Sequence, residues 1–164
     1  MKKPILSRLL CVLLLGALVF LLCACGNAGQ ADTADSVDVN KLAADIVATG
    51  AFTDVQTENN NGQALSVYGL EDDSVSDYSV YFSSMATPEE VAIFKISSPE
   101  QASAVTDACK ARQSSQVQSY ESYAPDQVEK LNNAMIGTSG DLVYYIVSKD
   151  NDTVKNVLQE NGLQ

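Results

Sequence analysis

The apolar run from Leu9 to Leu22 decides which part of this chain can fold as a domain. A basic start with Lys2, Lys3 and Arg8 precedes it and small residues follow it, which is the pattern of a secretory signal. A helix of these fourteen residues spans about 21 Å, whereas the hydrocarbon core of a bilayer is about 30 Å thick. The run is too short for a permanent transmembrane helix, so we expect residues 1–24 to be a signal peptide.

The end of this segment resembles the bacterial lipobox, in which Leu, a small or aliphatic residue and Ala or Gly precede a Cys. Here Leu22, Cys23 and Ala24 precede Cys25. The resemblance implies cleavage before Cys25 and lipidation of Cys25 with a fatty acid such as palmitate. An ordinary signal peptide that leaves Cys25 as a free thiol is the alternative. We expect a lipoprotein anchored in the cell membrane, with its domain on the extracytoplasmic face.

Removal of the signal segment makes an acidic chain more acidic. The full sequence has 10 basic and 21 acidic residues, and residues 1–24 contain three of the basic ones and none of the acidic ones. Seven basic residues and a formal charge of −14 remain. Nucleic acid and anionic lipid surfaces repel such a chain, so we expect no nucleic-acid partner and a membrane contact through the lipid alone.

The rest of the chain divides into a tether and one domain. Residues 25–37 are small and polar and lack the apolar density of a core, which predicts a flexible tether. Residues 38–164 have a suitable length for a single domain. With Cys25 acylated, Cys109 has no partner for a disulfide, and its helical spacing with Ala102 and Val105 predicts a buried thiol.

Periodicity and turn residues predict the order helix, hairpin, helix, hairpin, helix. The expected helices span 39–49 after an Asp38 cap, 99–117 after a capping box of Ser98 and Gln101, and a last segment after an Asp150 cap. The expected strands are 78–82, 91–96, 134–138 and 142–147, with loop chain at 52–62, a connector at 120–125 and a short helical turn after Pro125. The fold class is therefore α+β, with an antiparallel four-stranded sheet made of two hairpins and about three helices packed on it.

Several stretches of the domain resemble the domain-of-unknown-function family numbered 4358. These stretches are Tyr68-Gly69-Leu70, Tyr78-Ser79-Val80-Tyr81, residues 89–95, Arg112 in the following helix, Tyr123-Ala124-Pro125 and the late hairpin. The resemblance covers about residues 40–160 and implies a short lipoprotein of Gram-positive bacteria. It implies no activity and supplies no catalytic residues.

The composition excludes several kinds of active site. The chain has no histidine, so Ser/His/Asp and Cys/His nucleophile systems and histidine metal sites cannot form. It also lacks the glycine-rich loops that bind nucleotides, and we expect no cofactor. Glu89 and Glu90 are adjacent in an extended stretch and should point to opposite faces, which makes them a poor acid–base pair.

Two acidic clusters contain enough carboxylates for a calcium site. They are Glu71, Asp72, Asp73 and Asp77, and Asp150 with Asp152. Neither cluster has the ligand spacing and glycine of an EF-hand loop. A solvated turn and an acidic helix start explain them more simply, so no metal site is predicted.

The remaining candidate site is Arg112 with Tyr120 and Tyr123. Arg112 continues the buried stripe of its helix, so its guanidinium either pairs with a carboxylate such as Glu121 or Asp126, or binds a ligand carboxylate or phosphate between the two tyrosines. We expect a binding or interaction module with a protein or small-molecule partner at the cell envelope. A cell-envelope hydrolase that uses carboxylates alone is the alternative, and it requires two facing carboxylates in a pocket.

Overall fold

The computed structural model describes residues 37–54, 56–59, 61–84 and 86–163, and five antiparallel strands form one sheet among them. The strands are β1 (Thr57–Glu58), β2 (Val75–Phe82), β3 (Glu90–Ile96), β4 (Met135–Ser139) and β5 (Leu142–Val147). Their order in the sheet is β1-β2-β3-β5-β4. The predicted hairpins are β2–β3 and β4–β5, and they join through an antiparallel pairing of β3 with β5. The antiparallel α+β fold is therefore confirmed, and β1 adds a fifth strand in a stretch predicted as loop.

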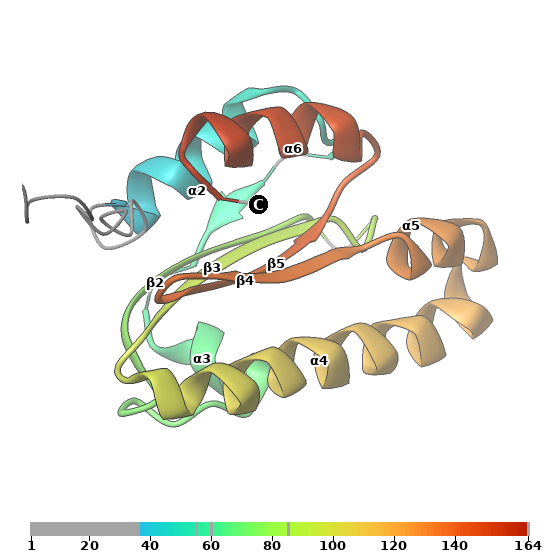
Figure 1. The fold of residues 1–164 in the computed structure, drawn as a ribbon. Helices are drawn as coiled ribbons and strands as arrows, with labels where there is room; N and C mark the ends of the chain where they lie inside the picture. Colours follow the sequence, from blue (N-terminus) through green and yellow to red (C-terminus); the bar gives the residue numbers. More distant parts are fainter. Residues whose placement is uncertain (1–36, 55, 60, 85, 164) are drawn as a thin grey trace, which may run out of the picture. The chain divides into compact units, whose positions relative to one another are not determined.

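Helices cover both faces of the sheet (Figure 1). One face packs against α2 (Val39–Ala48) and α6 (Asn151–Glu160), and the other against α3 (Gln63–Tyr68), α4 (Ala102–Tyr123) and α5 (Val128–Asn132). The prediction of about three helices was too low for the described residues. It missed α3, which Gly69 ends in a left-handed conformation at φ 65°, and it reduced α5 to a helical turn.

The aspartate caps form as predicted. The Asp38 carboxylate accepts hydrogen bonds from the amides of Asn40 and Lys41, at 2.9 and 3.0 Å, and the Asp150 carboxylate accepts one from Thr153 at 3.1 Å. The capping box at Ser98 does not form, because the chain enters α4 through a 3₁₀ turn. In that turn the amide of Gln101 donates to the carbonyl of Ser98, so it is not available to the serine hydroxyl.

The helix α4 ends six residues later than predicted, so the predicted connector at 120–125 is mostly helix. The last turns of α4 consist mostly of polar residues. They therefore lack the periodic apolar pattern from which a helix is predicted. The helix stops at Tyr123 because Ala124 precedes Pro125, and a residue before proline is driven out of the helical conformation. This extension places Tyr120 and Tyr123 on the same helix as Arg112.

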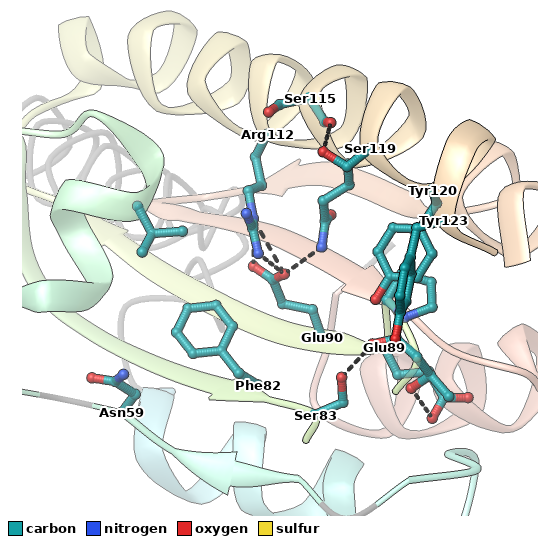
Figure 2. Close-up of a pocket in the computed structure, with 14 residues that line it drawn as sticks. Asn59, Phe82, Ser83, Glu89, Glu90, Arg112, Ser115, Ser119, Tyr120 and Tyr123 are labelled. Carbon is teal, nitrogen blue, oxygen red and sulfur yellow. Dashed lines mark hydrogen bonds and ion pairs between the residues drawn. The ribbon is translucent and has the colours of Figure 1, made fainter. Parts of the chain in front are cut away.

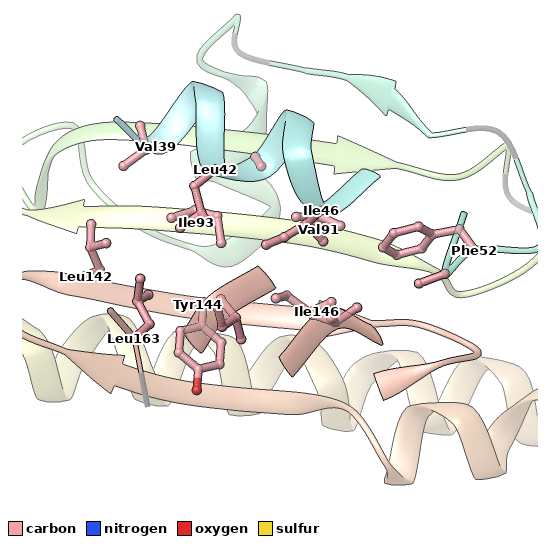
Figure 3. Close-up of a cluster of buried hydrophobic side chains, with 14 residues drawn as sticks. Val39, Leu42, Ile46, Phe52, Val91, Ile93, Leu142, Tyr144, Ile146 and Leu163 are labelled. Atoms are coloured by element: carbon pink, nitrogen blue, oxygen red, sulfur yellow. The ribbon is translucent and has the colours of Figure 1, made fainter. Parts of the chain in front are cut away.

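The two faces of the sheet carry alternate residues of the central strands. Val91 and Ile93 of β3 lie under α2 and α6 together with Leu142, Tyr144 and Ile146 of β5 (Figure 3). Ala92, Phe94, Val143, Tyr145 and Val147 face α4 on the other side. The strand predicted at 91–96 is thus buried on both faces, as its continuous apolar sequence indicated.

Cys109 lies on the face of α4 that packs against the sheet, and it is fully buried. This confirms the prediction of a buried thiol. Burial, reinforced by the negative charge of Glu90, raises the pKa of its thiol to about 12. We expect Cys109 to resist maleimide in native buffer and to react only after unfolding, because the thiolate is the reacting form. Mass spectrometry of the peptide that carries Cys109 measures this, and rapid labelling of the native protein would contradict it.

Candidate ligand-binding pocket

A pocket with a cavity volume of about 760 Å³ brings together the three predicted ligand-binding residues, Arg112, Tyr120 and Tyr123. It opens between α3, α4 and the loop that leads into β3 (Figure 2). The described residues that line it are Asn59, Val67, Phe82, Ser83, Thr87, Pro88, Glu89, Glu90, Arg112, Ser115, Gln116, Ser119, Tyr120 and Tyr123. Cys25, the predicted lipidation site, lies outside the described residues.

The floor of the pocket is an ion pair between Arg112 and Glu90. Nη2 of Arg112 lies 2.8 Å from Oε2 of Glu90, and Nε lies 3.3 Å from both carboxylate oxygens. Nε2 of Gln116 donates to the same carboxylate at 3.0 Å, and the hydroxyl of Tyr68 donates to its other oxygen. Tyr145 donates in turn to Oε1 of Gln116 at 2.5 Å. The Glu90 carboxylate, with 1% exposure, is thus held by three side chains, one from α3 and two from α4, and Tyr145 supports the third of them, Gln116.

The charges of this network stabilise one another. Burial alone would lower the pKa of Arg112, but the adjacent Glu90 carboxylate raises it above the ordinary value. Burial and the same carboxylate raise the pKa of Tyr68 well above its usual range, so its hydroxyl stays a proton donor. The guanidinium also lies 5.8 Å from the centre of the Phe82 ring. The guanidinium group of Arg112 therefore points toward Glu90. The partners suggested from the sequence, Glu121 and Asp126, were wrong.

The rim of the pocket is apolar and open to solvent. Among the described residues, Val67 and Tyr123 are the large hydrophobic side chains that remain exposed, at 43% and 72%, and both line this pocket. Tyr123 meets the half-buried Tyr120 edge to face, with ring centres 6.0 Å apart at 82°. Burial, followed by the neighbouring Tyr123, raises the pKa of Tyr120. Tyr144 and Tyr145, by contrast, are core residues.

Glu89 forms a second buried ion pair at the end of the pocket. Its Oε1 lies 2.7 Å from Nζ of Lys130, and its Oε2 accepts from the amides of Thr53 at 2.7 Å and Asp54 at 2.9 Å. Burial acts to raise the pKa of Glu89, but the bonds from Lys130 and the two amides outweigh it and hold this pKa below its ordinary value. Both Glu89 and Glu90 line the same pocket, but their carboxylates bind different elements: Glu90 binds α4, whereas Glu89 binds α5 and the chain after α2.

Residues 50–148 match the sequence profile of a family described as Domain of unknown function (DUF4358). This match spans more than half of the chain. The chain belongs to this family. No curated protein and no solved structure matches it. The resemblance stated from the sequence is confirmed, and the matched DUF4358 segment contains both ion pairs and the whole lining of the pocket.

Part of the DUF4358 pocket was missed in the sequence, and the reason differs between residues. Gln116 showed no signal of its own, although it lies four residues after Arg112 on the same face of α4. Val67 belongs to a stretch of residues 65–70 in which no helix was predicted. The short motifs of the resemblance, in contrast, include Tyr68, Glu89 and Glu90. Glu89 and Glu90 line the pocket, and Tyr68 supports it through its hydrogen bond to Glu90.

Three further findings apply to the described part of the DUF4358 chain. No three of its Cys, Asp and Glu side chains are grouped as metal ligands. Glu71, Asp72 and Asp73 are exposed in the turn before β2, and Asp150 caps α6. None of the described helices combines the length and the apolar character needed to span a bilayer.

Proposed function

We propose that this DUF4358 protein is an extracytoplasmic binding module, held at the cell membrane through a lipid on Cys25, whose pocket receives a partly apolar ligand or partner segment. The observation that supports the pocket's role is the rim: the exposed large hydrophobic side chains of the described residues, Val67 and Tyr123, both lie there. Exposed apolar groups around a concave site are typical of binding surfaces. A cavity of about 760 Å³ also falls within the usual range for small-molecule sites.

The interior of the pocket supports binding more than catalysis. Glu89 and Glu90 are the carboxylates of the lining, and each is 1% exposed and bound by several protein donors. A general acid or base needs a proton-transfer path to the substrate, and a carboxylate saturated by internal donors is poorly placed to provide one. The low pKa of Glu89 further weakens it as an acid. The carboxylate-only hydrolase stays as the alternative proposal, with less support from this geometry.

Crosslinking on intact cells tests the binding role. Cells that express the wild type, the double variant Val67→Ser/Tyr123→Ser or the control Glu121→Ser are treated with a short-range crosslinker, and the captured species are identified by mass spectrometry. Glu121 is exposed on the same helix but does not line the pocket. We expect a specific species with the wild type and the control that is lost in the double variant. Turnover of a wall or peptide substrate that depends on Glu89 or Glu90 would instead favour the hydrolase.

The proposed lipid anchor at Cys25 leads to a separate prediction. We expect Cys25→Ser to abolish incorporation of a labelled fatty acid and to move the protein from the membrane fraction to the medium, because a domain with this negative charge has no attraction to an anionic bilayer. Metabolic labelling and fractionation measure both effects. Cys109→Ser is the matched control and should keep the label. A wild type that takes up no fatty acid would contradict the anchor.

A further inference from the structure

The ion pair in the pocket floor leaves part of the Arg112 guanidinium without a partner. Nε and Nη2 bind Glu90 (Figure 2), and within the described residues no hydrogen bond uses Nη1. A planar guanidinium that presents Nε and Nη2 to one carboxylate has Nη1 on its other side, with two N–H donors. The Arg112 side chain is 24% exposed and that of Glu90 is 1% exposed, so the accessible part of the pair belongs to Arg112. A ligand can therefore bind Nη1 without displacing Glu90.

The charged side chains of the pocket favour an uncharged ligand. Among the described lining residues they are Arg112, Glu89 and Glu90. Arg112 is paired with Glu90, and Glu89 is paired with Lys130. A ligand carboxylate would compete with Glu90 for Arg112, and a ligand ammonium group would find no unpaired carboxylate in this lining. Either charge would lose its hydration without gaining a counter-charge. A carbonyl oxygen loses less hydration, and it accepts from the free donors of Nη1.

The pocket is long enough for an extended segment of chain. One wall is a single face of α4, which runs from Arg112 to Tyr123 and is about 16 Å long at about 1.5 Å per residue. Its residues are Arg112, Ser115, Gln116, Ser119, Tyr120 and Tyr123. Five residues of extended chain cover this length at about 3.3 Å each.

Exposed apolar side chains lie at both ends of this wall. Tyr123 is 72% exposed at one end. Val67 is 43% exposed at the other end, because it precedes Tyr68, whose hydroxyl binds the same Glu90 carboxylate as Arg112. The two ends can therefore each bury an apolar group of one elongated ligand, with the free donors of Arg112 beside the Val67 end.

We infer that the pocket binds an extended, uncharged peptide segment of a partner protein, with one backbone carbonyl on Nη1 of Arg112. This inference rests on the proposed binding function and names its ligand. Residues four apart in an extended chain point to the same side, so a five-residue segment can place one apolar side chain on Val67 and another on Tyr123. The main-chain carbonyl supplies the acceptor, and the apolar side chains at the two ends supply the buried area.

A series of peptides separates these contributions. Acetyl-Leu-Ser-Gly-Ser-Phe-amide is uncharged, two analogues carry Asp or Lys in place of its glycine, and acetyl-Ser-Ser-Gly-Ser-Ser-amide lacks the apolar ends. Binding to the full chain with Cys25→Ser is followed by amide NMR. We expect the first peptide to shift the signals of Val67, Arg112 and Tyr123, and to bind about tenfold more tightly than each of the other three. Salt should leave its affinity unchanged, because it brings no net charge.

Two variants test the two kinds of contact. Arg112→Lys keeps a positive charge beside Glu90 but lacks the guanidinium donors on the other side, so the uncharged peptide should bind about tenfold more weakly. Its circular dichroism and melting temperature are measured alongside, because the variant changes a buried ion pair. Tyr123→Ser changes an exposed side chain and should weaken binding by a similar factor. Gln118→Ser, at an exposed position of α4 outside the pocket lining, is the control and should bind as the wild type does.

The outcomes distinguish this inference from the proposed function. Equal affinity for the charged and uncharged peptides, or full affinity in a folded Arg112→Lys or in Tyr123→Ser, would overturn the inference. If Arg112→Lys does not fold, the charge series and Tyr123→Ser decide. Acetyl-leucine methylamide that binds as tightly as the five-residue peptide would also overturn it, because a small amide would then suffice. The proposed function stands in each case if the crosslink on intact cells depends on Val67 and Tyr123, and it fails if that crosslink is absent.

Discussion

Replacing Glu90 with glutamine is expected to lower the free energy of unfolding by about 3 kcal/mol, the low end for removing one member of a buried ion pair. Glutamine keeps the shape of the side chain, so the loss reports the charge and not a cavity. The variant leaves the Arg112 guanidinium without its counter-charge, while Gln116 and Tyr68 lose an acceptor for charged hydrogen bonds. The low end applies because the Arg112 side chain retains 24% exposure and can be partly solvated. Urea unfolding at neutral pH, followed by far-UV circular dichroism, measures the change.

Controls distinguish this ion pair from a general sensitivity to charge removal. Glu121→Gln changes an exposed glutamate of the same length and should alter stability by less than about 0.5 kcal/mol. Glu90→Gln combined with Arg112→Met should lose less than the sum of the single variants, because the double variant leaves no unpaired charge buried. If Glu90→Gln is no more destabilising than Glu121→Gln, the ion pair is not a structural element of the pocket.

Most of the fold could be predicted because its signals are local. The caps at Asp38 and Asp150 depend on residues two or three positions away, and both formed. The strand at 91–96 showed its burial as a continuous run of apolar residues. The strand β1 was missed because its sequence has no alternating apolar pattern. It has two residues, both exposed, and it pairs with β2 through backbone atoms.

Only part of the site could be predicted from the sequence. The contacts that were missed join residues that are far apart in the chain. The spacing on α4 placed Arg112 toward the core, and the extended helix placed Tyr120 and Tyr123 beside it. The partner of Arg112 lies 22 residues away, in a strand whose position against α4 depends on the whole sheet. Sequence reasoning chose Glu121 and Asp126 because they were near in the chain. Proximity in sequence does not locate a salt bridge between a helix and a strand.

The two adjacent glutamates link the pocket to the rest of the fold. Glu90 binds α4 through Arg112, whereas Glu89 binds α5 through Lys130 and the chain after α2 through the amides of Thr53 and Asp54. Elements from both faces of the sheet therefore meet at the start of β3. This arrangement fixes the pocket wall before any ligand arrives, which reduces the entropy that binding has to overcome.

Replacing Lys130 with methionine is expected to lower the free energy of unfolding by about 3 kcal/mol at neutral pH. Methionine preserves most of the side-chain volume, but the Glu89 carboxylate, whose side chain is fully buried, loses its cation. The amides of Thr53 and Asp54 still bind that carboxylate, which keeps the loss near the low end for a broken buried pair. Lys110→Met, which removes an exposed lysine from an i,i+3 pair on α4, is the matched control and should cost less than about 0.5 kcal/mol.

The pH dependence gives this prediction a second, independent readout. The pKa of Glu89 is lower in the folded protein than its ordinary value, so its contribution to stability is present above the pKa of the unfolded carboxyl, about 4.3, and is lost as the pH falls through the folded value. The deficit of Lys130→Met should therefore be largest at neutral pH and shrink in acid, once Glu89 is protonated and no longer needs a cation. Glu89→Gln/Lys130→Met should show a smaller deficit at neutral pH and little of this pH dependence. A deficit of Lys130→Met that stays constant from neutral pH into acid would mean that Lys130 acts through packing of its alkyl chain, and that the charge of Glu89 is stabilised by the backbone amides alone.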